Sequence, residues 1–176
     1  RAEGSGAPAV AQALLLRGEW SLARGQAADA EGSFKAAIAA FQTGVRRDLE
    51  GLARARLAQT WAASGRMQEA SAALQDAVRL AGSSESLAVR VALITAGAAV
   101  HAGDAESEVA ESRLRALVDQ TDHAEFPAQK FEAQLSLATL LAKTGRAVEA
   151  HTVRAGVIKE ARASGFLGLA SDAAQR

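Results

Sequence analysis

The amino-acid sequence predicts an all-α protein, and three observations carry that prediction. Alanine, the strongest helix former, fills 45 of the 176 positions. The chain has two prolines and no tyrosine, and aromatic residues make up 4% of it. Finally, Gly25, Gly65, Gly103 and Gly145 each follow an apolar helical pattern, at spacings of 40, 38 and 42 residues. A period near 40 in a helical chain indicates about four helical hairpins stacked as a solenoid.

Each of these glycines is expected just past the end of a first helix, where a left-handed backbone costs glycine little. The helices are then expected at about 9–24, 27–43, 46–64, 67–81, 85–102, 105–120, 124–144 and 147–164. A short terminal helix at about 167–174 should cover the last hairpin through Phe166, Leu167 and Leu169. Start signals are Ser83 or Ser84 for the fifth helix, Asp104 for the sixth, and a capping box from Asp122 to Glu125 for the seventh, with Pro127 in its first turn.

Residues 1–8 have the composition of a linker, and residues 9–176 are expected to form one helical repeat domain. The first residue is Arg1 rather than methionine, so we expect the chain to be a piece of a longer protein. The longest apolar run, from Val91 to Val100, is shorter than the roughly 20 residues that a membrane-spanning helix needs. We therefore expect no membrane association in this segment and a cytoplasmic location. The absence of cysteine excludes disulfides and thiol ligands.

The composition and motifs do not favour catalysis or nucleic-acid binding. Twenty basic and 20 acidic residues give a formal net charge of zero, whereas nucleic-acid binders are usually basic. The chain has no glycine-rich phosphate loop and no Gly-x-Ser-x-Gly turn. The histidines, His101, His123 and His151, stand apart from one another, and the carboxylates Glu106, Glu108 and Glu111 are expected on a solvated helix face. We predict a protein that is not an enzyme and holds no cofactor or metal.

A spaced pattern of small and large residues recurs around the glycines. A small residue precedes the glycine by seven positions, alanine follows it by five, a large apolar residue by nine and a second small residue by twelve. The first unit has Gly18, Gly25, Ala30, Phe34 and Ala37; the second has Ala58, Gly65, Ala70, Leu74 and Ala77; the fourth has Ala138, Gly145, Ala150 and Val157, with Arg154 in the large apolar position. The third unit reaches Ala110, Leu114 and Leu117 after a two-residue insertion. This pattern resembles the tetratricopeptide repeat over roughly residues 11–160.

The resemblance implies a right-handed α–α superhelix of about four hairpins with a terminal capping helix. It also implies that the first helices line a concave groove that binds a peptide or a partner domain. Carried onto this sequence, the candidate groove residues are Arg56, Gln59, Arg90, Ile94, His101 and Glu132. Arg56 and Arg90 come from adjacent units and should converge, so that an acidic side chain or chain terminus can bind between them. If the protein were instead an enzyme, His101 with Glu132 would be the one candidate catalytic pair.

A second function from a different class is also open. The longer 40-residue period, the preference for arginine over lysine and the C-terminal sequence EARASGFLGLASDAAQR resemble the regulatory tails of multidomain bacterial kinases and transcriptional regulators. That resemblance implies intramolecular contact with other domains of the same protein, or self-association, rather than a free peptide ligand. Trp20 and Trp61 bear on this choice, because we expect both to pack between helices, and the alternative for each is an exposed aromatic anchor for a partner.

Overall fold

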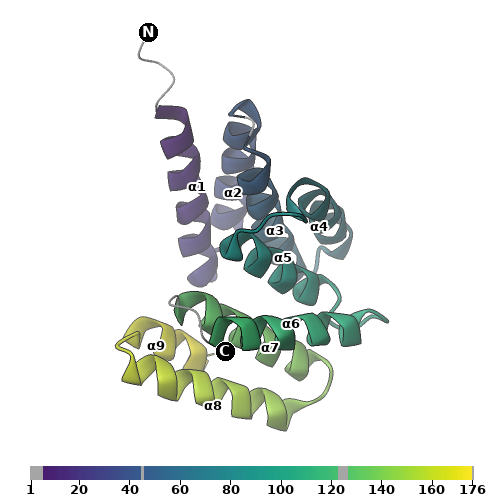
Figure 1. The fold of residues 1–176 in the computed structure, drawn as a ribbon, viewed down its shortest axis with the longest axis vertical. Coiled ribbons are helices and arrows are strands. Elements are labelled where there is room, and N and C mark those ends of the chain that lie inside the picture. Colours follow the sequence, from purple (N-terminus) through teal and green to yellow (C-terminus); the bar gives the residue numbers. More distant parts are fainter. Residues whose placement is uncertain (1–5, 45, 123–126, 176) are drawn as a thin grey trace. The chain divides into compact units, whose positions relative to one another are not determined.

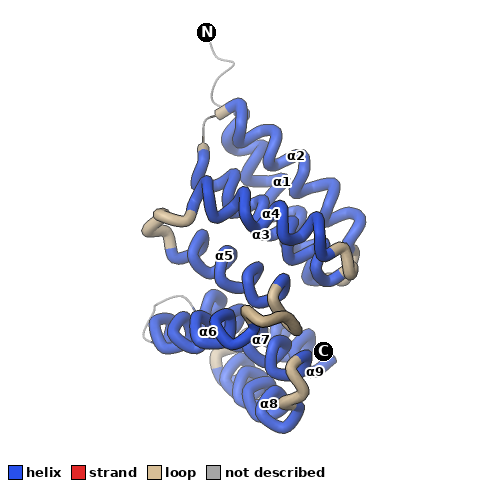
Figure 2. Tube along the Cα trace, turned by 90° about the vertical axis from the view of Figure 1, so that its right-hand side faces the viewer, coloured by secondary structure: helices blue, strands red, loops and turns tan. Residues whose placement is uncertain are grey.

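The computed structural model describes residues 6–44, 46–122 and 127–175, and every regular element among them is an α-helix (Figure 1, Figure 2). The helices are α1 (Gly6–Ala23), α2 (Ala27–Thr43), α3 (Arg47–Ala63), α4 (Met67–Ala81), α5 (Leu87–Val100), α6 (Ser107–Asp122), α7 (Pro127–Lys143), α8 (Ala147–Ala163) and α9 (Leu167–Gln175). Contacts between residues divide the chain into two compact units, Arg1–Ala96 and Gly97–Arg176. The first unit contains α1 to α4 and most of α5, and the second contains α6 to α9.

The all-α prediction is confirmed for the described residues, and the expected helix bounds lie within a few residues of the observed ones. The linker expected at residues 1–8 overlaps the structure only at residues 6–8, which belong to α1, and its first five residues lie outside the described part. Helix α7 begins at Pro127, so this proline does stand in the first turn, where its missing N–H is not needed. No described helix is long and apolar enough to cross a membrane.

Four turns between helices share one hydrogen-bonded geometry, and each contains a glycine with positive φ. The glycines are Gly25, Gly65, Gly145 and Gly165, with φ of 72°, 75°, 83° and 81°. In each turn the glycine N–H donates to the carbonyl three positions earlier, and the next residue's N–H donates to the carbonyl five positions earlier. The left-handed prediction is therefore confirmed at Gly25, Gly65 and Gly145. Gly103, with φ of 132°, lies outside the left-handed helical region, in the longer turn between α5 and α6.

Small residues allow close approach of the helices in the first unit. A side chain at Gly18 on α1 would meet the ring of Phe34 on α2 at 2.5 Å, and Phe34 is completely buried. A side chain at Gly51 on α3 would likewise meet the side chain of Ala81 on α4. The alanines that follow the turns, Ala30 and Ala70, are both 0% exposed. Small residues at these positions thus let the paired helices pack closely.

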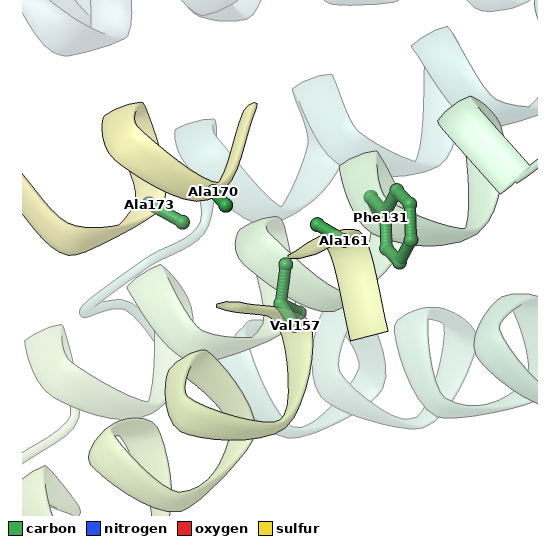
Figure 3. Close-up of a cluster of buried hydrophobic side chains, with 5 residues drawn as sticks. All are labelled: Phe131, Val157, Ala161, Ala170 and Ala173. Carbon is green, nitrogen blue, oxygen red and sulfur yellow. The ribbon is translucent and has the colours of Figure 1, made fainter. Parts of the chain in front are cut away.

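The core of the second unit gathers around α8. Figure 3 shows Phe131 of α7, Val157 and Ala161 of α8, and Ala170 and Ala173 of α9, all buried in one cluster. The Phe131 ring also meets the Phe166 ring edge to face, with centroids 5.8 Å apart. A terminal helix over the last hairpin was expected, and α9 packs there through its alanines. Leu167 does not contribute, because it is 68% exposed, and the side chain of Leu169 lies outside the described residues.

The predicted caps of α5 and α6 are wrong in detail. Ser84 accepts the N–H of Ser86 at 3.3 Å, one residue before α5 begins. Asp104 accepts the N–H of Glu106 at 2.8 Å, one residue before α6 begins. Both side chains thus form a short turn ahead of the helix instead of capping it. The predicted capping box from Asp122 to Glu125 falls on residues 123–125, which lie outside the described part of the chain.

Candidate functional site

An arginine directly after a turn glycine joins two helices in the first unit. Nη1 of Arg66 donates to Oε2 of Glu31 on α2 at 2.8 Å, and Nη2 donates to Oε1 of Glu69 on α4 at 2.7 Å. Nζ of Lys35 donates to Oε1 of Glu31 at 2.6 Å. Both cations also lie over the Trp61 ring, Arg66 at 5.1 Å and Lys35 at 5.6 Å from its centroid. We call these four charged residues the first clasp, because they tie α2 to the turn between α3 and α4.

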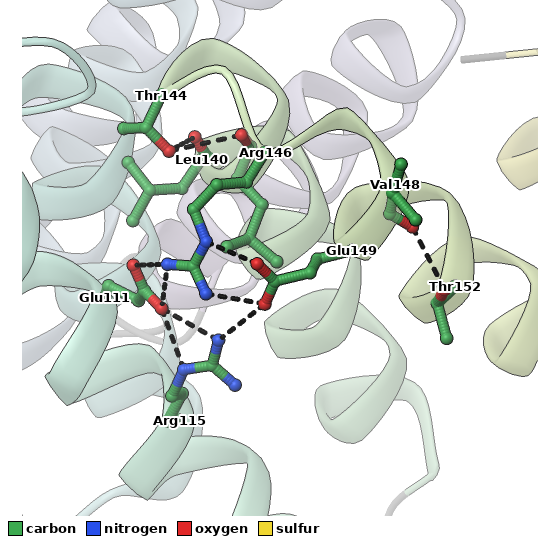
Figure 4. Close-up of polar contacts among 9 residues, drawn as sticks. Glu111, Arg115, Leu140, Thr144, Arg146, Val148, Glu149 and Thr152 are labelled. Atoms are coloured by element: carbon green, nitrogen blue, oxygen red, sulfur yellow. Dashed lines mark hydrogen bonds and ion pairs between the residues drawn. The ribbon is translucent and has the colours of Figure 1, made fainter.

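The same arrangement recurs 80 residues later in the second unit. Nη1 of Arg146 donates to both carboxylate oxygens of Glu111 on α6, at 2.8 and 2.7 Å, and Nε donates to Glu149 on α8 at 2.6 Å. Nε of Arg115 donates to Glu111 at 2.9 Å, as Lys35 does to Glu31. Figure 4 shows the carboxylates of Glu111 and Glu149 converging on the Arg146 guanidinium, with the Arg115 guanidinium next to it and joined to both carboxylates. We call these four residues the second clasp, and each stands 80 positions after its counterpart.

The 80-residue correspondence extends beyond the clasps. The turn glycines Gly65 and Gly145 correspond, and so do the buried alanines on the second helices. Gln42 donates to Glu50 at 2.9 Å, and 80 residues later Lys130 meets Asp122 at 2.6 Å, with the donor and acceptor exchanged. The block from α2 to α4 is therefore built like the block from α6 to α8. Such internal repetition supports an architecture of repeated helical hairpins.

The clasps hold their acidic members charged. The hydrogen bond from Lys35 lowers the pKa of Glu31 below its usual value, and the hydrogen bond from Arg66 lowers that of Glu69. Burial by itself would raise the pKa of Glu111, but hydrogen bonds from Arg115 and Arg146 outweigh it, and the net shift is downward. At neutral pH the clasp carboxylates are thus ionised and bound by the clasp cations, which gives these residues a structural role.

A line of polar side chains crosses the first helices of the first unit. Nε of Arg56 on α3 donates to Oε1 of Glu19 on α1 at 3.0 Å, and its Nη1 donates to Oε1 of Gln59 at 3.2 Å. The amide of Gln59 donates in turn to the hydroxyl of Thr95 on α5. The Arg56 side chain is 13% exposed, whereas the Glu19 carboxylate is 34% exposed. This polar line, Glu19–Arg56–Gln59–Thr95, joins α1, α3 and α5 on one face.

The structure brings some of the predicted groove residues together. Arg56 and Gln59 are hydrogen-bonded, and Gln59 reaches Thr95, the residue after Ile94. Arg90 and Ile94 lie half-buried on the same helix, α5. Around the polar line the face is filled by apolar side chains, because Leu52, Ala55 and Ala62 of α3 are buried. The face is therefore a narrow polar strip between packed residues.

The other two predicted groove residues belong to the second unit. Nδ1 of His101 donates a hydrogen bond to Oδ2 of Asp104, 2.8 Å away in the turn that follows α5, and this hydrogen bond lowers the pKa of Asp104. Glu132 lies half-buried on α7. Among the described residues, no three histidine, aspartate or glutamate side chains are grouped so as to hold a metal ion. A hollow of about 350 Å³ in the first unit is lined by Gln42, Arg47, Glu50, Arg79 and Leu80, none of which belongs to the polar line.

Two features of the structure were not predicted from the sequence: the largely buried position of Glu111 and the exposure of Trp20. Glu111 was expected on a solvated face, yet its side chain is 17% exposed and held by two arginines. The recurrence of Gly-Arg-x-x-Glu-Ala at Gly65 and Gly145, 80 residues apart, was the signal for the clasps. Trp20 was expected between helices, and this is wrong, because its side chain is 61% exposed. Trp61 is half-buried under the first clasp, as expected.

Comparison with protein-family models, with curated proteins and with solved structures finds no match.

Proposed function

We propose that this chain is a tetratricopeptide-like solenoid that acts as a non-catalytic protein-interaction module. Repeated hairpins with small interface residues and two equivalent clasps support the repeat architecture. The described residues offer hydrogen-bonding strips and exposed side chains rather than a cluster of nucleophile, base and oxyanion donors. A stack of rigid hairpins that presents side chains on one face suits the binding of a peptide or partner segment.

The observation that carries the proposal is the polar line on α1, α3 and α5. Arg56 is held in place by Gln59, while its carboxylate partner, Glu19, is one-third exposed. An acidic side chain or chain terminus of a partner can replace Glu19 on the guanidinium, because Glu19 can turn to water at little cost. Arg90 on α5 adds a second cation on a neighbouring first helix. The partner is thus an acidic peptide segment, bound by charge-assisted hydrogen bonds.

The experiment is a selection of peptides from a phage-displayed library on the immobilised chain. We expect the selected peptides to share an acidic side chain or to use a free C-terminus. Binding should be lost in the Arg56→Glu, Arg90→Glu double variant and weakened in the milder Arg56→Gln variant. The matched control is Arg113→Glu with Lys159→Glu, which makes the same charge change at two exposed positions of the second unit. Circular dichroism must show that all variants remain folded.

Two outcomes would contradict the proposal. Equal binding by the double variant and by its control would place the ligand elsewhere on the surface. Failure to select any peptide would favour the regulatory alternative, in which the face contacts other domains of the same protein or a second copy.

A further inference from the structure

The outward face of α1 carries large apolar side chains in solvent. Leu16 is 64% exposed and Trp20, one turn further on, is 61% exposed. Ala13 lies one turn before Leu16 on the same side of the helix and is also exposed. The guanidinium of Arg24 lies over the Trp20 ring, 4.6 Å from its centroid. A largely exposed tryptophan beside an exposed leucine forms an apolar surface patch, and tryptophan is enriched among the residues that dominate protein interfaces.

The repeat register shows that three of the positions corresponding to this face are buried in the later first helices. The positions 40 residues after Ala13, Arg17 and Trp20 are Ala53, Leu57 and Thr60 of α3, which are 0%, 4% and 1% exposed. Helix α2 packs against α3 and supplies the first clasp. The positions another 80 residues on are Ala133, Leu137 and Leu140 of α7, which are also buried, and α6 packs against α7 in the same way. In α3 and α7 the preceding second helix thus packs against the helix that carries this face, whereas no described helix covers the exposed Leu16 and Trp20 of α1.

The exposed face of α1 carries positive charge at a position that is apolar and buried in α3 and α7, and this charge favours an acidic partner. Where the buried copies have Leu57 and Leu137, α1 has Arg17, which is exposed. With Arg24 this makes a basic edge along the apolar stripe. Glu19 is the one carboxylate in the sequence of α1, and it is engaged by Arg56. The stripe is thus apolar at its centre and positive at its edge, which complements a helix that is apolar on one face and acidic beside it.

We propose that the surface formed by Ala13, Leu16, Arg17 and Trp20 of α1, with Arg24 of the turn that follows, is a docking surface for an amphipathic helix with an acidic edge, supplied by a partner protein. The docked helix takes the place that α2 takes on α3 and α6 takes on α7. Its apolar side chains cover Leu16 and Trp20, and its carboxylates reach Arg17 and Arg24. This surface is additional to the polar line, so a partner can contact both or either.

The probe is a synthetic peptide of residues 107–122, labelled with fluorescein. This is the sequence of α6, the helix that packs on the corresponding face of α7, and it carries four carboxylates and two arginines. A scrambled peptide of the same composition is the control for non-specific charge attraction. In a Trp61→Phe background, Trp20 is the one remaining tryptophan, so its emission reports directly on this face. We expect the peptide to bind, shift Trp20 emission to the blue and protect it from acrylamide.

Substitutions then place the peptide on α1. Leu16→Asp and Trp20→Ala should each weaken binding about 10-fold or more in fluorescence anisotropy, a loss typical of interface anchors. Arg17→Glu with Arg24→Glu should also weaken it and reduce its dependence on salt. Val148→Asp is the matched control for Leu16→Asp, because Val148 on α8 is 82% exposed. The Arg56→Gln variant should bind this peptide normally, which separates this proposal from the proposed function.

Three results would overturn the proposal. The first is that the peptide binds no better than its scrambled form. The second is that the Leu16→Asp and Val148→Asp variants bind the peptide equally well. The third is a sedimentation result in which the chain self-associates and Leu16→Asp abolishes the association, which would make a second copy of the chain the occupant of this face.

Discussion

Gly18 is the position at which the packing of the first hairpin can be tested most sharply. An alanine there would place its Cβ 2.5 Å from the ring of Phe34, well inside van der Waals contact. Phe34 is 0% exposed, so its ring has no free space to move into. Overpacking of this kind costs about 1–3 kcal/mol. Against it stands the higher helix propensity of alanine, worth about 1 kcal/mol. The net result for Gly18→Ala is therefore a loss of about 0–2 kcal/mol.

The control is Gly32→Ala on α2. Gly32 is also inside a helix, but no atom lies within 4 Å of a Cβ built there. Only the propensity effect remains, so Gly32→Ala should stabilise the protein by about 1 kcal/mol. The difference between the two variants is the packing cost alone, about 1–3 kcal/mol.

Urea unfolding followed by tryptophan fluorescence is the assay, because both tryptophans lie in the first unit. Adding Phe34→Leu to Gly18→Ala should recover part of the loss, since the smaller side chain relieves the contact. If Gly18→Ala stabilises the protein as much as Gly32→Ala does, then α1 and α2 do not approach as closely as described, and the reasoning fails.

Three further predictions concern the turns, the clasps and the second core. Gly145→Ala should cost about 1 kcal/mol in urea unfolding, because φ is 83° there, while Gly156→Ala, in open space on α8, should stabilise. The clasp carboxylates have lowered pKa values when folded, so their stabilisation is present above the unfolded pKa and is lost as pH falls through the folded values. The melting temperature should therefore drop on acidification below about pH 5, and less steeply in Glu111→Gln. Phe131→Ala should cost about 3–5 kcal/mol, measured by circular dichroism, because Phe131 is fully buried against α8 and α9.

Local backbone chemistry explains why the helices were predictable from the sequence. Glycine is the one residue that ends a helix in the left-handed conformation without strain, so Gly25, Gly65 and Gly145 marked the turns. Small residues such as Gly18 and Ala30 recur because only they leave room for a second helix. The turn glycines and the small residues can both be recognised in the sequence, even when the arrangement of the hairpins is not known.

Contacts between distant residues explain what was missed. Glu111 looks like a solvated residue in its own helix, and only Arg146, 35 residues away, makes it a structural one. Ser84 and Asp104 have the chemistry of caps, but the helices begin too far along the chain for them to act as such. Trp20 has apolar neighbours in the sequence, but no described helix covers the face on which it lies, and the sequence pattern alone does not show which copy of a repeated face stays open.

Within the candidate site, the sequence pointed to Arg56 and Gln59, and the structure shows that these two are hydrogen-bonded. It did not point to Glu19 as the internal partner of Arg56, because the spacing of 37 residues departs from the 40-residue period. That internal ion pair changes the expected behaviour of the site, since a partner must compete with Glu19.

This competition gives the most direct test of the proposed function. The measurement is the affinity of a selected acidic peptide for the wild-type chain, for Glu19→Gln and for Arg56→Gln, by isothermal titration calorimetry. Glu19→Gln removes the competing carboxylate and should strengthen binding, whereas Arg56→Gln removes the cation and should weaken it. Opposite changes in the two variants are the predicted result. Equal affinities in all three proteins, or weaker binding in both variants, would contradict a site in which the ligand replaces Glu19 on Arg56.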